Sequence, residues 1–203
     1  LKSSSDEFDV LDAGTTMRFL TAYTAIGSDK KRLTGTPRML ERPIGTLITA
    51  LVRLGAKIDF ENKPGFPPLL VRPFKNQLAR EVEIKGNESS QFISALLMIA
   101  PVLPQGLTLR LRGKINSRPY IQMTLDIMEE FGISYDWNGD SIAIESQNYQ
   151  PPTQYVIESD WSAASYWYSI VALSDDAKIK LLGLKKNSKQ GDIAINKIMN
   201  QLG

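Results

Sequence analysis

The sequence predicts an α+β fold built from repeated βαβαββ units, two nearly complete and a third partial. Two observations lead to this prediction. Helical patterns over 44–54 and 119–131 have similar lengths, each begins beside a proline, and each ends at a glycine, Gly55 or Gly132. Proline at a helix start and glycine just past its end are the expected asymmetry of helices. Strand-like stretches follow each pattern, and the second pair is joined by Asn138-Gly139, a strong hairpin signal.

The first unit begins with a helical pattern over 17–25, opened by Gly14-Thr15-Thr16. Its second helix, over 44–54, places apolar residues at the spacing of one helical face. Alternating stretches over 56–60 and 69–73 predict two strands, because prolines and a glycine separate them. We expect every unit to begin with a short strand of its own.

The same order recurs twice along the chain. The second unit has predicted helices over 92–100 and 119–131, with strands over 107–111, 133–137 and 142–144. The third has helices over 160–171 and 191–202, with a strand over 178–182. The composition changes near Pro151-Pro152, which predicts a domain boundary there.

Composition limits the possible chemistry. The 203 residues carry a net charge of +2 and include neither cysteine nor histidine. Disulfides and thiolate metal sites are therefore excluded, and the commonest general base near neutral pH is missing. No apolar run approaches the roughly 20 residues of a membrane span, and the small charge argues against nucleic acid. The chain starts at Leu1 and its last helical pattern stops abruptly, so we expect a fragment of a longer protein.

Four predicted helix starts are rich in hydroxyl, amide and arginine side chains. They lie at Gly14, after Arg38 and Arg42, at Ser89-Ser90-Gln91, and at 117–120. Helix N-termini favour anions, and arginine binds phosphate or carboxylate through two hydrogen bonds. If the units bring these starts together, they form a site for a small ligand with several negative charges.

Simpler interpretations exist for each segment. Serine and threonine at helix starts usually act as caps. Arg42 beside Glu41 is also compatible with a solvated surface pair, and Tyr120 and Trp161 with core or rim positions. Single residues therefore predict only a possible anion site.

Motifs of several residues are more specific than single residues. Six segments follow one another across nearly the whole chain: 11–18 (LDAGTTMR), 33–56, 89–97 (SSQFISALL), 117–124, 159–166 and 187–192. In type and order they resemble the signatures of the EPSP synthase family of enolpyruvyl transferases. The resemblance implies the enolpyruvyl transferase fold. It also implies transfer of the enolpyruvyl group from phosphoenolpyruvate to the 5-hydroxyl of shikimate 3-phosphate, with release of phosphate, in chorismate and aromatic amino acid biosynthesis.

The resemblance also assigns site residues. Shikimate 3-phosphate would be held by Ser89, Ser90, Gln91, Ser117 and Tyr120. Phosphoenolpyruvate would meet Gly14, Arg42 and Gln91. No cofactor or metal is implied, and neither nucleic acid nor membrane is a partner. A cytoplasmic location, a monomeric full-length enzyme and a role as the glyphosate target are implied as well.

The match covers part of the family pattern. Residues 1–157 would form most of the first, shikimate 3-phosphate-binding domain, and residues 158–203 the opening unit of the second. The carboxylates and lysine that the family uses for proton transfer have no counterpart here and are expected in the missing C-terminal part, so we expect the chain to be inactive alone. Asp12 stands where the family has asparagine, and Phe19 where it has proline. The first departure weakens the anion-site inference, and the second bears on glyphosate sensitivity.

Three alternatives remain, one of which is a purely structural fragment without ligand affinity. UDP-N-acetylglucosamine enolpyruvyl transferases carry a cysteine in the loop that here reads Gly35-Thr36-Pro37-Arg38-Met39, and this chain has none. A non-catalytic repeat module that binds nucleotides or RNA ends would show a basic stripe with aromatic platforms, which the balanced charge does not favour.

Overall fold

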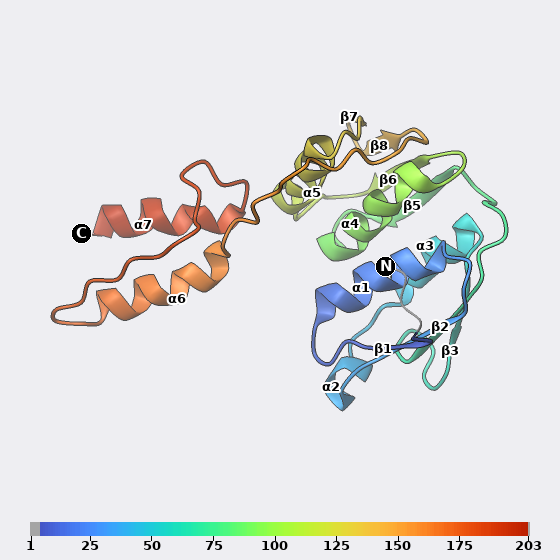
Figure 1. Cartoon of the computed structure of the whole chain (residues 1–203), viewed down its shortest axis with the longest axis horizontal. Coiled ribbons are helices and arrows are strands. Elements are labelled where there is room, and N and C mark those ends of the chain that lie inside the picture. Colours follow the sequence, from blue (N-terminus) through green and yellow to red (C-terminus); the bar gives the residue numbers. More distant parts are fainter. Residues whose placement is uncertain (1–4, 203) are drawn as a thin grey trace. The chain divides into compact units, whose positions relative to one another are not determined.

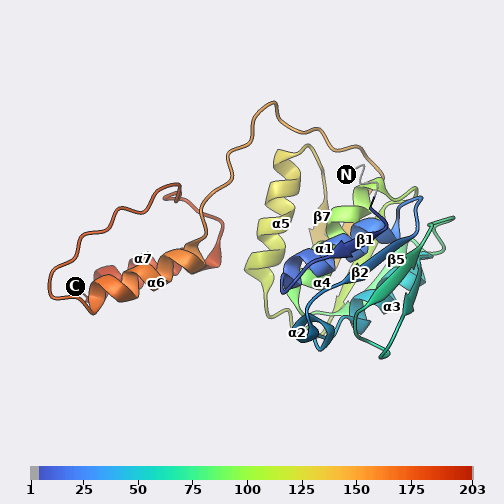
Figure 2. The same cartoon turned by 60° about the horizontal axis from the view of Figure 1, so that its bottom comes forward.

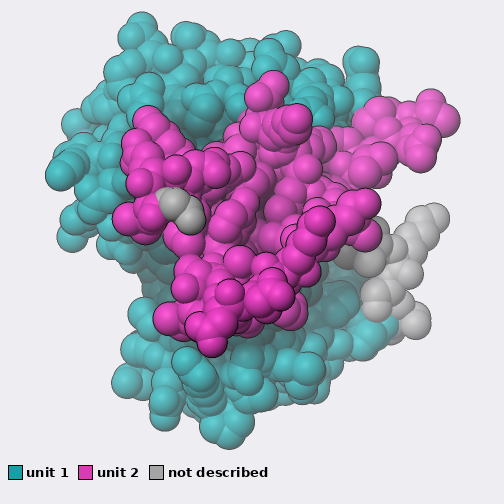
Figure 3. Space-filling model, turned by 90° about the vertical axis from the view of Figure 1, so that its left-hand side faces the viewer, with its two compact units in different colours: residues 1–151 teal, residues 152–203 magenta. Residues whose placement is uncertain are grey.

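The computed structural model describes residues 5–202 and divides the chain into two compact units. Unit 1 comprises Leu1–Pro151 and unit 2 comprises Pro152–Gly203 (Figure 3). Each unit has its own secondary structure, and each is described by itself below.

Unit 1 contains two four-stranded sheets with the same topology. The first sheet has the strand order β1-β2-β4-β3, formed by Glu7–Asp9, Lys31–Thr34, Leu69–Arg72 and Lys57–Phe60. The second has the order β5-β6-β8-β7, formed by Glu81–Lys85, Leu107–Arg112, Ser141–Ile144 and Asp136–Asn138. In both, the first two strands pair in parallel and the remaining pairs are antiparallel. This shared pattern confirms the predicted α+β repeat.

The helices occupy equivalent places in the two repeats. A helix connects the parallel strands, α1 (Gly14–Ala25) in the first repeat and α4 (Ser90–Ile99) in the second. Another helix follows the second strand, α3 (Gly45–Leu54) or α5 (Arg118–Glu130), and a one-turn α2 (Pro37–Leu40) precedes α3. After these helices the chain turns at Gly55 (φ 112°) and Gly132 (φ 81°). A side chain is strained at such angles, which explains the glycines that predicted both helix ends.

The core of unit 1 lies between its helices and sheets. Side chains alternate between buried and exposed along β5 and β6, so each strand turns its apolar residues inward. Most of α4 is buried, and this helix packs against both α1 and α5 (Figures 1 and 2). Close packing of the three helices places the starts of α1 and α4, and of α4 and α5, on neighbouring elements.

Three strands of unit 1 were expected but not located from the sequence. They are β1, β2 and β5, the opening strand of each repeat and the partner of β1. The hairpin turn at Asn138-Gly139 was predicted correctly, although β7 begins at Asp136 and not at Ile133. Strand ends depend on partners elsewhere in the chain, so local periodicity leaves them open.

Unit 2 has helices and no strand within its described residues. It contains α6 (Trp161–Ala172), a 3₁₀ turn, η2 (Gly191–Ile193), and α7 (Ala194–Leu202). The predicted strand over 178–182 is wrong for this structure, because no other strand of unit 2 is present to accept its hydrogen bonds.

Polar contacts hold unit 2 together. The Glu158 carboxylate accepts hydrogen bonds from Trp161 Nε1 (2.9 Å), the Lys185 amide (3.0 Å) and Ser188 Oγ (2.9 Å). These bonds join the start of α6 to the loop before η2. Within residues 5–202, no helix is both long enough and apolar enough to cross a bilayer.

Candidate functional site

A pocket of about 530 Å³ in unit 1 is lined by α4, α5 and the first half of α1. Its polar side includes all five side chains predicted to hold the larger substrate, namely Ser89, Ser90, Gln91, Ser117 and Tyr120. Its apolar side is formed by Phe19, Met98, Met123, Ile127 and Met128. Residues that lie apart in the sequence therefore line one cavity.

The start of α4 is shaped by Ser89. This residue is the N-cap, and its hydroxyl accepts a long hydrogen bond of 3.4 Å from the Gln91 amide. Ser89, Ser90 and Gln91 all line the pocket, so the N-terminus of α4 lies at the pocket, and a helix N-terminus favours an anion. The Gln91 side chain donates to Thr15 Oγ1 at 2.9 Å and so ties this helix start to that of α1.

The start of α5 is built differently. Ser117 is its N-cap residue but makes no side-chain capping bond, so its hydroxyl is not consumed by the helix. Arg118 lies over the Trp137 ring, 4.1 Å from the centroid, an arrangement that favours a cation–π contact. Tyr120 is 41% exposed, so a ligand in the pocket has access to its ring.

The helices α4 and α5 are also joined beneath the pocket. The hydroxyls of Ser94 and Thr124 lie 2.7 Å apart, and Thr124 donates to the Tyr120 carbonyl at 3.0 Å. Since Thr124 gives its proton to that carbonyl, Ser94 must be the donor of the shorter bond. Sequence analysis placed both residues inside motifs, 89–97 and 117–124, but gave neither of them a role of its own. A helical spacing of four residues from Ser90 and from Tyr120 is a further signal.

Gly14 and Arg42 lie against each other beside the pocket. Gly14 is buried in the first turn of α1, and a methyl group built on it would overlap the Arg42 guanidinium, 2.6 Å from Nη2. Arg42 Nη1 donates to the Asp12 carbonyl at 3.4 Å. These two predicted residues do not line the pocket itself, but Thr15, next to Gly14, does. The bond from Gln91 to Thr15 is the link between the two groups.

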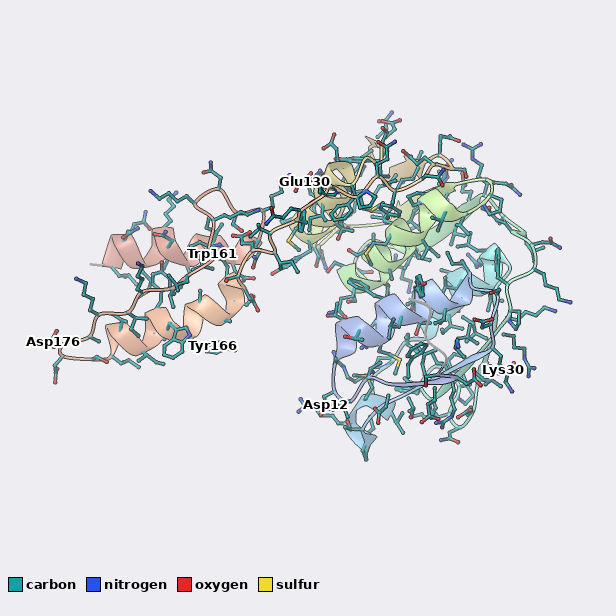
Figure 4. All side chains as sticks on the ribbon, viewed as in Figure 1. Asp12, Lys30, Glu130, Trp161, Tyr166 and Asp176 are labelled. Atoms are coloured by element: carbon teal, nitrogen blue, oxygen red, sulfur yellow. The ribbon has the colours of Figure 1, made fainter. Side chains whose placement is uncertain are left out.

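The loop before α1 is held in a defined shape. Leu11 has a positive φ of 50°, an uncommon angle for a branched side chain. The Asp12 carboxylate accepts a 2.5 Å hydrogen bond from Thr36 Oγ1 (Asp12 is labelled in Figure 4). Asp12 makes no ion pair within the described range 5–202. The contact of Arg42 with Asp12 is therefore to the main-chain carbonyl and not to the carboxylate.

Arg18 is a further charged residue of this region. It is only 5% exposed, and burial, followed by the positive charge of Arg42, lowers the pKa of its guanidinium. The sequence analysis treated Arg18 as part of a motif and gave it no role of its own. Among the described residues, no group of acidic side chains is arranged to hold a metal ion.

Comparison with known proteins identifies the family. A model of the family described as EPSP synthase (3-phosphoshikimate 1-carboxyvinyltransferase) matches residues 2–203. This chain belongs to the EPSP synthase family. The match confirms the family predicted from the six motifs and favours neither the related transferase nor the repeat module.

Relatives of the EPSP synthase family agree with this assignment. The chain is 49% identical over 204 residues to a 3-phosphoshikimate 1-carboxyvinyltransferase of Bacteroides fragilis (strain YCH46), covering 100% of this chain and 49% of the relative. It is 41% identical over 194 residues to the enzyme of the same name from Citrobacter koseri, covering 95% and 45%. A structure of EPSP synthase from Acinetobacter baumannii superimposes with a TM-score of 0.77 at 19% identity, covering 100% of this chain and 44% of that one.

The structural match confirms the enolpyruvyl transferase fold. The chain spans about half the length of the relatives that it matches. The roles of individual site residues in this member of the EPSP synthase family stay predictions, supported by the geometry of the pocket.

Proposed function

We propose that this chain is part of an enzyme that transfers the enolpyruvyl group of phosphoenolpyruvate to the 5-hydroxyl of shikimate 3-phosphate and releases phosphate. The reaction belongs to chorismate and aromatic amino acid biosynthesis, and we place the enzyme in the cytoplasm as a monomer. The observation that carries the proposal is the pocket between α4 and α5, lined by all five residues predicted to hold shikimate 3-phosphate.

The chemistry of the pocket suits this substrate. Shikimate 3-phosphate carries a phosphate, a carboxylate and hydroxyls. Ser89, Ser90 and Ser117 offer hydroxyls beside two helix N-termini, where an anion gains about 0.3–1 kcal/mol from each helix. Tyr120 offers a ring and a phenol at the rim. The apolar side of the pocket fits the carbon ring of the substrate.

Phosphoenolpyruvate would bind at Gly14 and Arg42. The absence of a side chain at Gly14 leaves room for the guanidinium, and an arginine can bind a carboxylate or phosphate through two parallel bonds. Gln91 contacts Thr15 and lines the pocket, so it stands between the two substrate positions. Such fixed donors stabilise charge that develops in a transition state.

The proposed domain assignment gives residues 1–157 to the shikimate 3-phosphate-binding domain and 158–203 to the second. The division into units at Pro151 and Pro152 lies close to this boundary and supports it.

Binding of shikimate 3-phosphate by the chain tests the proposal. Titration followed by ¹H–¹⁵N NMR should shift the amides of 89–91 and 117–120. Ser90→Ala should weaken binding by about three- to tenfold, the ratio for one neutral hydrogen bond. Ser28→Ala is the control, since Ser28 lies in an exposed turn away from the pocket. Shifts that cluster outside the pocket, or equal effects of both variants, would contradict the proposal.

The chain alone should not catalyse enolpyruvyl transfer. It spans about half the length of its relatives, and the family resemblance implies that the proton-transfer groups belong to the other half. General acid–base catalysis is typically worth about 10²–10⁴-fold, and closure of a second domain also excludes water. Phosphate release from the two substrates, measured with a coupled assay on the purified chain, is expected to equal the rate without protein. A protein-dependent rate would show that this prediction is wrong.

A further inference from the structure

Arg18 is a buried cation that joins two segments of unit 1. It lies one turn into α1 and is only 5% exposed. Its Nη1 donates to the Gly14 carbonyl at 2.9 Å, and its Nη2 donates to the Pro43 carbonyl at 3.3 Å. One guanidinium therefore connects the first turn of α1 to the loop that leads into α3.

Both of these carbonyls belong to segments that carry a residue predicted to bind phosphoenolpyruvate. The first is the carbonyl of Gly14 itself, and the second is that of Pro43, which directly follows Arg42. The planar guanidinium fixes the angle between its two donors, so the two backbone segments are held at a set distance. Arg42 has a weak tether of its own, the 3.4 Å bond to the Asp12 carbonyl.

The charge of Arg18 has no acidic partner. Across residues 5–202, no ion pair includes Arg18, and its Nε is a buried nitrogen without a hydrogen-bond partner. Two uncharged groups also lie near the guanidinium. Arg18 Nη1 is 4.0 Å from Met39 Sδ, and Arg18 Cζ is 5.9 Å from the centroid of the Phe92 ring. Buried charges in proteins are normally paired, and leaving one unpaired is destabilising.

A second cation increases this imbalance. Burial lowers the pKa of Arg18, and the charge of Arg42 lowers it further. Two arginines thus share a region that contains the N-terminus of α1. A negative ligand bound at Arg42 would relieve the repulsion between them, since opposite charges at short range favour the ionised form.

We propose that Arg18 is a positioning residue for the anion site of Gly14 and Arg42. It holds the two segments that carry this pair together, and its unpaired charge raises the positive potential there. It acts through Arg42 and does not touch the ligand. The inference rests on the proposed function, because phosphoenolpyruvate is the anion assigned to this pair.

Two variants separate the two effects of Arg18. Arg18→Lys keeps the charge but loses the fork that bridges two carbonyls, and Arg18→Met loses both while keeping the length of the side chain. Arg53→Met is the control, because Arg53 is an exposed arginine on α3. Thermal unfolding of each variant shows whether the fold is retained.

The first measurement uses NMR of arginine side chains in the unaltered chain and in each variant. Phosphoenolpyruvate, added up to its solubility limit, should shift the Nε resonances of both Arg18 and Arg42 in the unaltered chain. Its affinity should fall about tenfold in Arg18→Lys, the ratio for one charge-assisted hydrogen bond, and further in Arg18→Met. Arg53→Met should bind as the unaltered chain does.

Shikimate 3-phosphate gives the comparison that separates this inference from the proposed function. Its affinity should change less than twofold in the Arg18 variants, because its residues lie on α4 and α5. If both ligands weaken together, Arg18 acts only on the fold and the inference is wrong. If phosphoenolpyruvate leaves the Arg18 resonance unchanged in the unaltered chain, the inference is wrong even where the variants fail to fold. Failure of shikimate 3-phosphate to bind the pocket would instead contradict the proposed function.

Discussion

Gly14 sets the position of the Arg42 guanidinium. The backbone of Gly14 does not need a glycine angle, since it lies within α1 and its φ is not positive. Space is the reason for the glycine, because an added Cβ would overlap the terminal atoms of Arg42. The far end of an arginine moves easily, so a substitution here shifts the side chain and not the helix.

We expect Gly14→Ala to keep the fold and to displace Arg42. Alanine favours a helix over glycine by up to about 1 kcal/mol, so the melting temperature should not fall. Binding of phosphoenolpyruvate should weaken about tenfold through loss of one charge-assisted contact, measured by NMR titration. Gly191→Ala is the matched control, since nothing lies within 4 Å of its added Cβ. Unchanged binding in Gly14→Ala would show that Arg42 has no part in this site.

We expect Asp12 to oppose binding of an anion at the proposed site of Gly14 and Arg42. Its carboxylate accepts a hydrogen bond from Thr36, whereas Arg42 donates only to the main-chain carbonyl of Asp12. Asparagine would keep an acceptor for Thr36 and remove the charge.

Asp12→Asn should therefore strengthen binding of phosphoenolpyruvate by roughly two- to fivefold, the scale of an exposed charge pair. The gain should shrink as salt is added, because ions screen exposed charges. Asp29→Asn, an exposed change elsewhere in unit 1, should have no such effect. Titrations at low and high salt check this, and a gain that does not depend on salt would point to a change of shape.

Sequence reasoning selected its candidate site residues from local motifs. The serines at the starts of α4 and α5 belong to such motifs, and the structure places them in one pocket. Arg18 was missed because an arginine inside a helix usually lies at the surface. Its burial follows from the packing of α1 against α4 and from the Pro43 carbonyl, which no local pattern contains.

At the scale of elements, one side chain fixes the linker between the two repeats. Gln77 lies in the segment between the two sheets and is 9% exposed. Its Nε2 donates to the carbonyls of Ala79 (2.9 Å) and Gly106 (2.8 Å), and its Oε1 accepts from the Gln105 amide (2.8 Å). The linker is thereby fixed to the turn that precedes β6.

Gln77→Leu should lower the free energy of unfolding by about 2–4 kcal/mol, because the partners of Gln77 lose their bonds and each unsatisfied buried group is destabilising by about 1–3 kcal/mol. Urea denaturation measures the change. Gln105→Leu keeps the backbone amide that Gln77 binds and alters only an exposed side chain, so its effect should stay within about 0.5 kcal/mol. Equal effects of the two variants would show that the bonds of Gln77 do not stabilise the linker.

Elements were predictable where their signals are local. The glycine after α3 and after α5 marked both helix ends, because each adopts a positive φ. β5 alternates buried and exposed residues and was recognisable in principle, whereas β1 has three residues and depends on β2 for its pairing. The stretch 178–182 has strand-like residues but no partner, and a strand without a partner leaves its backbone groups unpaired.

At the scale of the whole molecule, the two units differ in how much they bury. The hydrophobic cluster runs from Val10 to Ile144, within unit 1. In α6 only Trp161 and Ala164 are buried, and α7 buries none of its residues. Several large apolar side chains of unit 2 are exposed, among them Ile157, Tyr166, Leu173 and Leu202. Most of the hydrophobic stabilisation of the chain therefore belongs to unit 1.

Residues 1–151 alone should fold and bind shikimate 3-phosphate as the whole chain does. Every residue that lines the pocket lies between Thr15 and Met128, and the ties among α1, α4 and α5 are all internal to unit 1. Hydrogen exchange should accordingly protect α4 amides far longer than those of α6 or α7, since exchange follows local burial. Calorimetry on the truncated and complete chains should give affinities within about twofold, the margin for sites that do not share partners. A large loss of affinity on truncation would mean that residues 152–203 contribute to binding, and the assignment of the pocket to unit 1 alone would then be wrong.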